Sequence, residues 1–274
     1  ALGCALATLI TLVIAALLTD TVSAIRAEHS LARALLRSPT LEFEPEVTIS
    51  GFPFLPQARN AEFSGAVITA RGVAVPGCAQ RGGCRAELGA ALGEFTSDDW
   101  LIGPGDVLHT RSVTAYTRLD SVNLGRLLNI IDLTVNTPAP ADKPGGGGPG
   151  DGLLERTTGV LLTGTVPLGA PVSEIPPSAS AYPGPTVTVS VTVDLDVVDG
   201  RLHIIPTGFY DGPEDHVDAD VPAAQRDEVL AHFSRTLPRL PSPWDISPTT
   251  ARSQGSDIVL TAATDARDLR PEEF

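Results

Sequence analysis

The sequence predicts an α+β fold, in which a long, bent and mostly antiparallel sheet wraps on a few helices and follows one N-terminal transmembrane helix. Residues 186–197 alternate between apolar and polar side chains, which is typical of a strand with one dry and one solvated face. Residues 1–19 contain no charge. Residues 121–131 and 222–237 carry apolar side chains at helical spacing, so they can cover the dry face of the sheet.

The composition is that of a folded chain with an aliphatic core. Of the 274 residues, 42% are hydrophobic, 19% are charged and 5% are aromatic. Such a chain is not disordered and can bury a substantial core. The formal net charge is −14. This charge argues against nucleic acid as the main partner, because binding to its phosphates requires a basic face.

Residues 1–19 are long enough to cross a lipid bilayer. As a helix that rises about 1.5 Å per residue, they span roughly 28 Å, close to the hydrocarbon thickness of about 30 Å. One alternative is a signal peptide, for which Val22-Ser23-Ala24 offers a cleavage site. The length of the apolar run favours an uncleaved anchor. We therefore expect a signal anchor at 1–19 in the plasma membrane, and a single domain at 20–274 on its extracytoplasmic side.

The first elements after the anchor are a helix and two strands. Apolar residues at helical spacing continue the helix over 20–37. From Val47 and Ile49 onward, apolar and polar side chains alternate, as in a strand. A turn at 51–57 interrupts this alternation. Residues 61–75 predict a second strand, with these side chains on one face: Phe63, Val67, Val73 and Val75.

A segment rich in glycine and proline divides the middle of the chain. Before it, residues 107–119 predict a strand and residues 121–131 predict a short amphipathic helix. Residues 138–152 contain too much glycine and proline to pack into a core. We expect a flexible surface loop within one domain there, because the strand pattern resumes on both sides.

The longest strands are predicted after this segment. Residues 160–168 and 186–197 are one-sided strands, Asp199-Gly200 marks a hairpin turn, and residues 202–205 form the return strand. A final strand is predicted at 257–263. The predicted sheet is therefore long-stranded, with an apolar face that must be covered.

An acidic segment precedes the last predicted helix, which covers residues 222–237. Its acidic and imidazole side chains are Asp211, Glu214, Asp215, His216, Asp218 and Asp220. Such a group could bind a divalent cation, but its spacing does not fit an EF-hand. We favour a solvated loop without a metal, in which Asp220 is the N-cap of the helix.

The motifs of common catalytic sites are missing from the sequence. It has no nucleophile elbow, and no Lys-Ser or Lys-Thr follows the GGGGPG run, as a P-loop would require. Cys78 and Cys84 have no evident His base. The Gly-rich spacer between them lets the two sulfurs meet, so in an exported protein a disulfide is favoured over free thiols or a zinc site. We expect no enzyme activity and no cofactor.

A bent sheet over helices has two possible interiors. It can enclose an elongated apolar groove that suits an acyl chain, or its own side chains can fill it. A Pro-flanked turn at 52–55 forms either a hydrophobic plug, or the lip of such a groove, or a contact with the bilayer. The candidate groove and lip residues are Phe52, Phe54, Leu55, Phe63, Leu127, Leu128, Ile131 and Phe233, of which Phe233 also fits a core position.

Several short segments follow one another in a characteristic order over residues 20–268. Four of them are short motifs: VxIxGFPFL at 47–55, ARGV at 70–73, VxDGxL at 197–202 with Pro206, and GSDIVLTA at 255–262. The others are the predicted strand at 113–119 with Tyr116, the Leu-rich helix at 124–131 and the pair LP at 240–241. As an ordered set they resemble the LmeA family of actinobacterial envelope proteins, which is also known as the DUF2993 domain.

The resemblance implies a phospholipid-binding envelope protein with a fold similar to the tubular lipid-binding (TULIP-like) proteins. In the mycobacterial relatives, the role is linked to mannan elongation in lipoglycans. This chain departs from the family pattern in its insertion at 138–152, its Cys78–Cys84 loop and its polar stretch at 249–256. These departures bear on the mannan role more than on lipid binding.

The leading hypothesis is a membrane-anchored, extracytoplasmic phospholipid-binding protein of the cell envelope. It would hold an acyl chain in an apolar groove and support lipoglycan or envelope lipid metabolism. Its expected partners are a phospholipid and the plasma membrane. The alternative is an accessory or assembly subunit with a scaffold role in a larger membrane complex.

Overall fold

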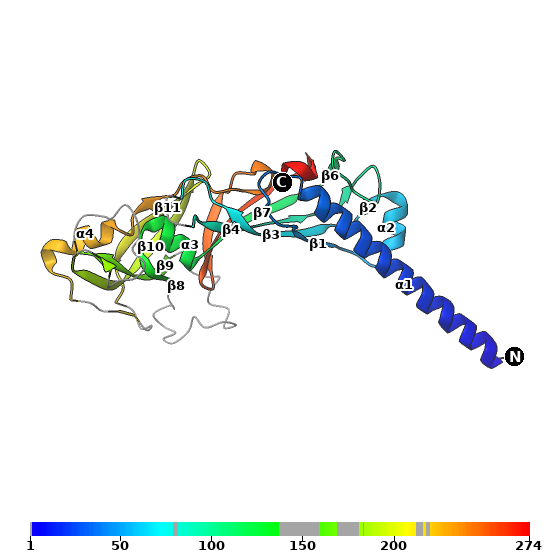
Figure 1. The fold of residues 1–274 in the computed structure, drawn as a ribbon, viewed down its shortest axis with the longest axis horizontal. Helices are drawn as coiled ribbons and strands as arrows, with labels where there is room; N and C mark the ends of the chain where they lie inside the picture. The colour runs from blue at the N-terminus through cyan, green and yellow to red at the C-terminus, as the bar shows by residue number, and fades with distance from the viewer. Residues whose placement is uncertain are drawn as a thin grey trace.

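The protein is elongated, and its two ends are built from different elements (Figure 1). The computed structural model describes residues 2–78, 82–136, 159–168, 181–182, 184–211, 216–217 and 220–274, with side chains from residue 6 onward. The expected loop at 138–152 lies outside the described residues. Helix α1 (Leu2–Leu35) leaves one end of the molecule, and the opposite end contains α3 (Ser121–Leu128) and α4 (Arg226–Ala231).

The strands form three antiparallel sheets, which confirms the predicted α+β class. The six-stranded sheet has the order β1-β3-β4-β7-β14-β13, the five-stranded sheet β12-β11-β10-β9-β8 and the four-stranded sheet β15-β6-β5-β2. The bounds are β1 (Glu46–Ile49), β2 (Glu62–Phe63), β3 (Ala66–Ala74), β4 (Arg85–Leu92), β5 (Phe95–Thr96), β6 (Leu108–Thr110), β7 (Val113–Asp120), β8 (Ile131–Asn136), β9 (Gly159–Pro167), β10 (Thr186–Val198), β11 (Arg201–Phe209), β12 (Arg235–Thr236), β13 (Thr250–Gln254), β14 (Asp257–Thr264) and β15 (Arg267–Leu269).

The buried apolar side chains divide into two clusters along the molecule. The proximal cluster lies between α1, α2 (Phe54–Asn60), the four-stranded sheet and the near part of the six-stranded sheet. The distal cluster lies between the five-stranded sheet, α3 and α4, which together we call the distal lobe. Strand β7 contributes to both, because Ala115 belongs to the proximal cluster and Leu119 to the distal one. The six-stranded sheet thus connects the two ends.

Helix α1 passes from an exposed environment into the protein without a break. Its first part is open to the surroundings, and Leu12 and Leu18 are each 62% exposed. Its last part packs beside β1 and α2, where Ala27, Leu31 and Leu35 are fully buried. The helix therefore forms part of the proximal core as well as the expected anchor.

A carboxylate of α1 caps the neighbouring helix α2. Asp20 is 5% exposed. Its Oδ2 accepts the N–H of Phe54 at 3.0 Å, and its Oδ1 accepts the N–H of Leu55 at 2.7 Å. Pro53, at the N-cap position of α2, makes no side-chain cap bond. Asp20 therefore satisfies N–H groups that a local cap would normally bind, and the predicted turn at 51–57 instead leads into a helix.

The predicted strand over 61–75 divides into β2 and β3, and the predicted position of one of its residues is wrong. Val67 is 48% exposed, whereas Ile68 and Ala70 face inward. A register shift between Ala70 and Val73 then restores Val73 to the buried face. A bulge changes which residues face the core, because the side-chain period of a strand is two.

The long hairpin in the distal lobe is confirmed. β10 and β11 pair from Val198 and Arg201 outward. The turn residues Asp199 and Gly200 have φ values of 51° and 71°, as the Asp-Gly pair predicts.

The last predicted helix is shorter than expected. A 3₁₀ turn (η2, Ala223–Gln225) leads into α4, and the chain then enters β12. Thr236 pairs with His203, and the N–H of Leu237 donates to Leu202, so sheet hydrogen bonds replace the last helical turn. The N-cap positions belong to Pro222 for η2 and to Gln225 for α4, so the predicted cap at Asp220 is wrong.

We expect the six-stranded sheet to pack well only with glycine at position 89. Gly89 pairs with Tyr116 across β4 and β7, and a Cβ at this position would overlap the Tyr116 ring. We expect Gly89→Ala to lower the free energy of unfolding by about 1–3 kcal/mol through overpacking, measured by thermal unfolding in detergent. The control is Gly208→Ala, where a Cβ would meet nothing within 4 Å. Equal stability of the two variants would contradict this account.

Asp20 should stabilise the attachment of α2 to α1. We expect Asp20→Ala to cost about 1 kcal/mol, as the loss of a helix cap does, and to speed amide hydrogen exchange at Phe54 and Leu55. Asp20→Asn is the matched control, since its amide oxygen can still accept one of the two N–H groups. Unchanged exchange at both amides in Asp20→Ala would show that the cap does not hold α2.

Candidate functional site

The structure places the predicted groove and lip residues in separate regions. Phe54 and Phe63 lie in the proximal cluster, and Leu127, Leu128 and Phe233 lie in the distal cluster. Ile131 is buried at the start of β8. Phe52 and Leu55 are exposed beside and within α2. The distal lobe therefore gathers the aliphatic candidates, and α2 carries the exposed ones.

Aromatic rings pack on one another within the proximal cluster. The Phe63 ring stacks on Phe95 with centroids 4.8 Å apart, and its centroid is 6.1 Å from that of Phe54. Trp100 meets Phe54 edge to face at 6.3 Å. Aromatic pairs at these distances stabilise a core beyond the area that they bury. Phe54 and Phe63 thus form a hydrophobic plug at the end of the sheet.

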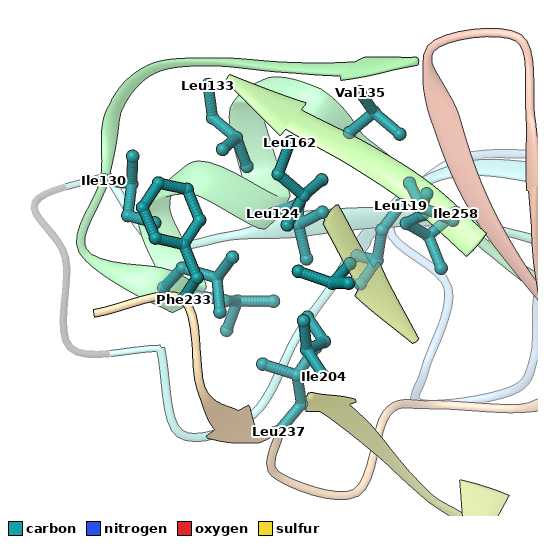
Figure 2. Close-up of a cluster of buried hydrophobic side chains, with 14 of the residues drawn as sticks. Leu119, Leu124, Ile130, Leu133, Val135, Leu162, Ile204, Phe233, Leu237 and Ile258 are labelled. Carbon is teal, nitrogen blue, oxygen red and sulfur yellow. The ribbon is translucent and has the colours of Figure 1, made fainter. Parts of the chain in front are cut away.

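The distal cluster is almost entirely aliphatic. Helix α3 contributes Leu124, Leu127 and Leu128, which pack against the apolar face of the five-stranded sheet. Figure 2 shows Leu162, Ile204, Phe233 and Leu237 around the same interior. The sheet side chains in the cluster are Leu133, Val135, Val160, Leu162, Val166, Val189, Val191, Val193, Leu202 and Ile204. Such an interior interacts with a guest through apolar contact alone.

Two glycines allow the close packing of the corner between α3 and β8. A Cβ at Gly125 would lie 2.8 Å from the carbonyl oxygen of Ile130, and one at Gly164 would overlap the Ile130 side chain. Both positions therefore exclude larger residues. A glycine inside a helix or strand pattern is a recognised sign of close approach, so these positions could have been found from the sequence.

Partly buried apolar residues border the distal cluster. They include Leu168, Val187, Leu195, Phe209 and Leu230. At this border the guanidinium of Arg226 lies 4.4 Å from the centroid of the Phe209 ring. An exposed cation beside an apolar border can pair with a phosphate. Sequence reasoning missed this pair, because nothing local brings α4 to the end of β11.

The opposite face of the five-stranded sheet is lined with hydroxyl groups. The hydroxyls of Thr163 and Ser190 are 2.7 Å apart, and those of Thr165 and Thr188 are 2.8 Å apart. Burial raises the pKa of Tyr182, and the charge of Asp132 raises it further. The sheet therefore has one polar and one aliphatic face, and the aliphatic face is the one that α3 and α4 cover.

A charged network crosses the outer face of the six-stranded sheet. Glu87 accepts the hydroxyl of Tyr116 at 3.1 Å and lies 3.5 Å from Arg118, which is 3.6 Å from Asp257. Burial raises the pKa of Asp257, and the Arg118 guanidinium opposes that shift. These groups pair across β4, β7 and β14, so the network is a structural feature of the sheet.

The acidic segment lies largely outside the described residues, since Glu214, Asp215 and Asp218 are not described. His216 packs edge to face on Tyr210 with centroids 5.2 Å apart. Within the part of the chain that the structure describes, no group of three His, Cys, Asp or Glu side chains could hold a metal ion.

The predicted disulfide is confirmed. Cys78 and Cys84 are bonded, with Cα atoms 5.7 Å apart. Cys84 is 1% exposed and belongs to the distal cluster, against which Cys78 packs. The N–H of Val75 donates to the Cys84 carbonyl at 2.9 Å. The loop is thereby joined to the distal core.

The apolar helix α1 and one family match bear on where and how this protein acts. From Leu6 to Leu35, helix α1 is long and apolar enough to cross a membrane, a property that signal sequences share. No curated protein and no solved structure matches the chain. A family model described as LmeA-like phospholipid-binding matches residues 18–263. The chain therefore belongs to the LmeA-like phospholipid-binding family.

Proposed function

We propose that this protein is anchored in the plasma membrane by α1 and holds the acyl chain of a phospholipid in its distal lobe, on the extracytoplasmic side. The observation that supports this proposal most directly is the aliphatic interior between α3, α4 and the five-stranded sheet. Family membership supports the lipid class. The role is binding and shielding, in support of envelope lipid or lipoglycan metabolism.

The energetics of an acyl chain fit such an interior. Each buried methylene contributes about 0.8 kcal/mol, so roughly ten of them contribute about 8 kcal/mol before the cost of opening the lobe. Within the described chain the cluster side chains are at most 6% exposed, so the lobe must open to admit a guest. Affinity would then come from aliphatic contact, without a charged residue inside.

We assign the opening to α4. This helix has only six residues, and its apolar side chains Val229 and Leu230 cover the sheet beside Phe233. Separating a short helix from a sheet exposes less apolar surface than separating a long strand from its neighbours. Arg226, at the start of α4, would then lie beside the headgroup phosphate while the acyl chain occupies the space under Phe209 and Leu230.

The proposed location can be mapped with a photoreactive phospholipid. The full-length protein in nanodiscs is loaded with a phospholipid that carries a diazirine in its acyl chain, irradiated and digested for mass spectrometry. We expect adducts on α3, α4, β10 and β11. Adducts confined to α1 and α2 would overturn the proposal, since those elements lie at the other end of the molecule (Figure 1). A stoichiometric protein partner and no loaded lipid would favour the scaffold alternative.

Leu230→Glu should reduce loading of this lipid several-fold. The substitution places a carboxylate at the border of the aliphatic interior, where its desolvation opposes insertion of an acyl chain. Uptake of labelled phospholipid from donor vesicles is the measurement. Leu101→Glu is the matched control, because Leu101 is 41% exposed and lies outside the distal cluster. Equal uptake by the two variants would contradict access under α4.

A further inference from the structure

We propose that the segment Phe52–Pro56, together with Val22 and Ile25 of α1, forms a second contact with the bilayer that α1 enters. We call this surface the α2 corner. The inference rests on the proposed anchoring by α1 and extends it: the α2 corner dips into the zone between headgroups and acyl chains.

The α2 corner exposes large apolar side chains both around α2 and on α1. Phe52 is 74% exposed and Leu55 is 40% exposed, and the prolines on either side of Phe54 are exposed as well. On the adjoining helix, Val22 is 47% exposed and Ile25 is 57% exposed. Aromatic and aliphatic side chains of this kind lower their free energy at a membrane interface.

The pattern of charge on α1 places this corner at the depth of the interface. Asp20 is turned into the protein and bound by α2, so the exposed side of α1 stays uncharged as far as Ile25. The part of α1 from Leu6 to Ile25 rises about 30 Å at 1.5 Å per residue, which is enough to cross the hydrocarbon core with Ile25 at its edge. The next charged residue is the exposed Arg26, whose side chain can reach lipid phosphates.

The bond between Asp20 and α2 explains how a carboxylate can lie at this depth. A bare carboxylate near the hydrocarbon edge is costly. Two N–H groups of α2 donate hydrogen bonds to Asp20 at 2.7 and 3.0 Å, so the carboxylate has partners in place of water. The same bonds hold α2 beside Asp20, at the same depth in the membrane. Any bilayer that surrounds the uncharged part of α1 therefore meets the α2 corner.

The bilayer fits this surface better than a protein partner does, because the surface continues that of the anchor. Val22 and Ile25 extend the exposed apolar side of α1, Leu55 lies on the helix joined to Asp20, and Phe52 lies just before that helix. The exposed Arg59 at the end of α2 supplies a second cation for the phosphates. A second contact would also prevent rotation of the domain about α1 and so fix the direction in which the distal lobe extends.

Spin-label depth measurements test this inference on the full chain. A nitroxide is attached at Phe52→Cys or Leu55→Cys in a Cys4→Ser background, in which Cys78 and Cys84 stay disulfide-bonded. The protein is reconstituted in vesicles of phosphatidylcholine and phosphatidylglycerol. The ratio of collisions with oxygen to collisions with a water-soluble nickel chelate reports depth. Val198→Cys, at an exposed site on the β10 hairpin, is the aqueous control, and Val13→Cys on α1 is the membrane control.

We expect the ratio at both α2 positions to exceed the ratio at position 198 several-fold and to lie below that at position 13. A high ratio at position 13, together with ratios at positions 52 and 55 as low as that at position 198, would overturn the α2 contact. Such a result would still support α1 as the anchor. An aqueous value at position 13 would overturn the anchor, and the α2 contact with it. High values at positions 52 and 55 in detergent-free protein without vesicles would point to burial by another copy and would also overturn it.

Discussion

The packing of α1 against the proximal cluster fixes where the rest of the molecule lies. Ala27, Leu31 and Leu35 are fully buried, and Oε1 of Glu28 accepts the N–H of Ile49 in β1 at 2.9 Å. Small side chains let the helix approach closely, and the buried acceptors satisfy backbone groups that would otherwise lack a partner. Because the helix is unbroken, any constraint on its exposed half is transmitted to the sheet.

The two apolar clusters differ in their chemistry, and this difference follows the length of the molecule. Near α1, the rings of Phe54, Phe63 and Phe95 pack on one another and form a rigid plug. At the opposite end, aliphatic side chains from α3 and the five-stranded sheet meet, with Phe233 as a ring among them. The distal cluster therefore offers aliphatic contacts almost throughout, whereas the proximal cluster also contains stacked and edge-to-face rings.

The polar groups of the sheets belong to the architecture. Glu87, Arg118 and Asp257 pair across three strands, and the hydroxyls of Thr163 and Ser190 pair across two. Such cross-strand pairs fix the register on the polar face of each sheet while the opposite face remains apolar. The chemistry available to a ligand in the distal lobe is therefore that of apolar contact, which agrees with membership in a phospholipid-binding family.

The sequence by itself determined the elements whose signals are local. The alternation over 186–197 became β10, and Asp199-Gly200 became its turn, because side-chain period and turn geometry depend on neighbouring residues. Residues 6–19 of the uncharged run lie in the exposed part of α1. For the site, Leu127, Leu128 and Phe233 were predicted to line a lipid groove or to fill the core, and all three lie in the buried distal cluster.

Only the tertiary structure decided how these elements meet. The cap of α2 comes from Asp20, more than thirty residues earlier, and the ring of Tyr116 requires Gly89 on another strand. The bulge after Ala70 returned Val73 to the buried face, opposite to the exposed Val67, and pairing with β11 ended the last helix early. The contact of Arg226 with Phe209 likewise has no local signal. Each depends on contacts between residues distant in sequence, and these form only when the whole chain packs.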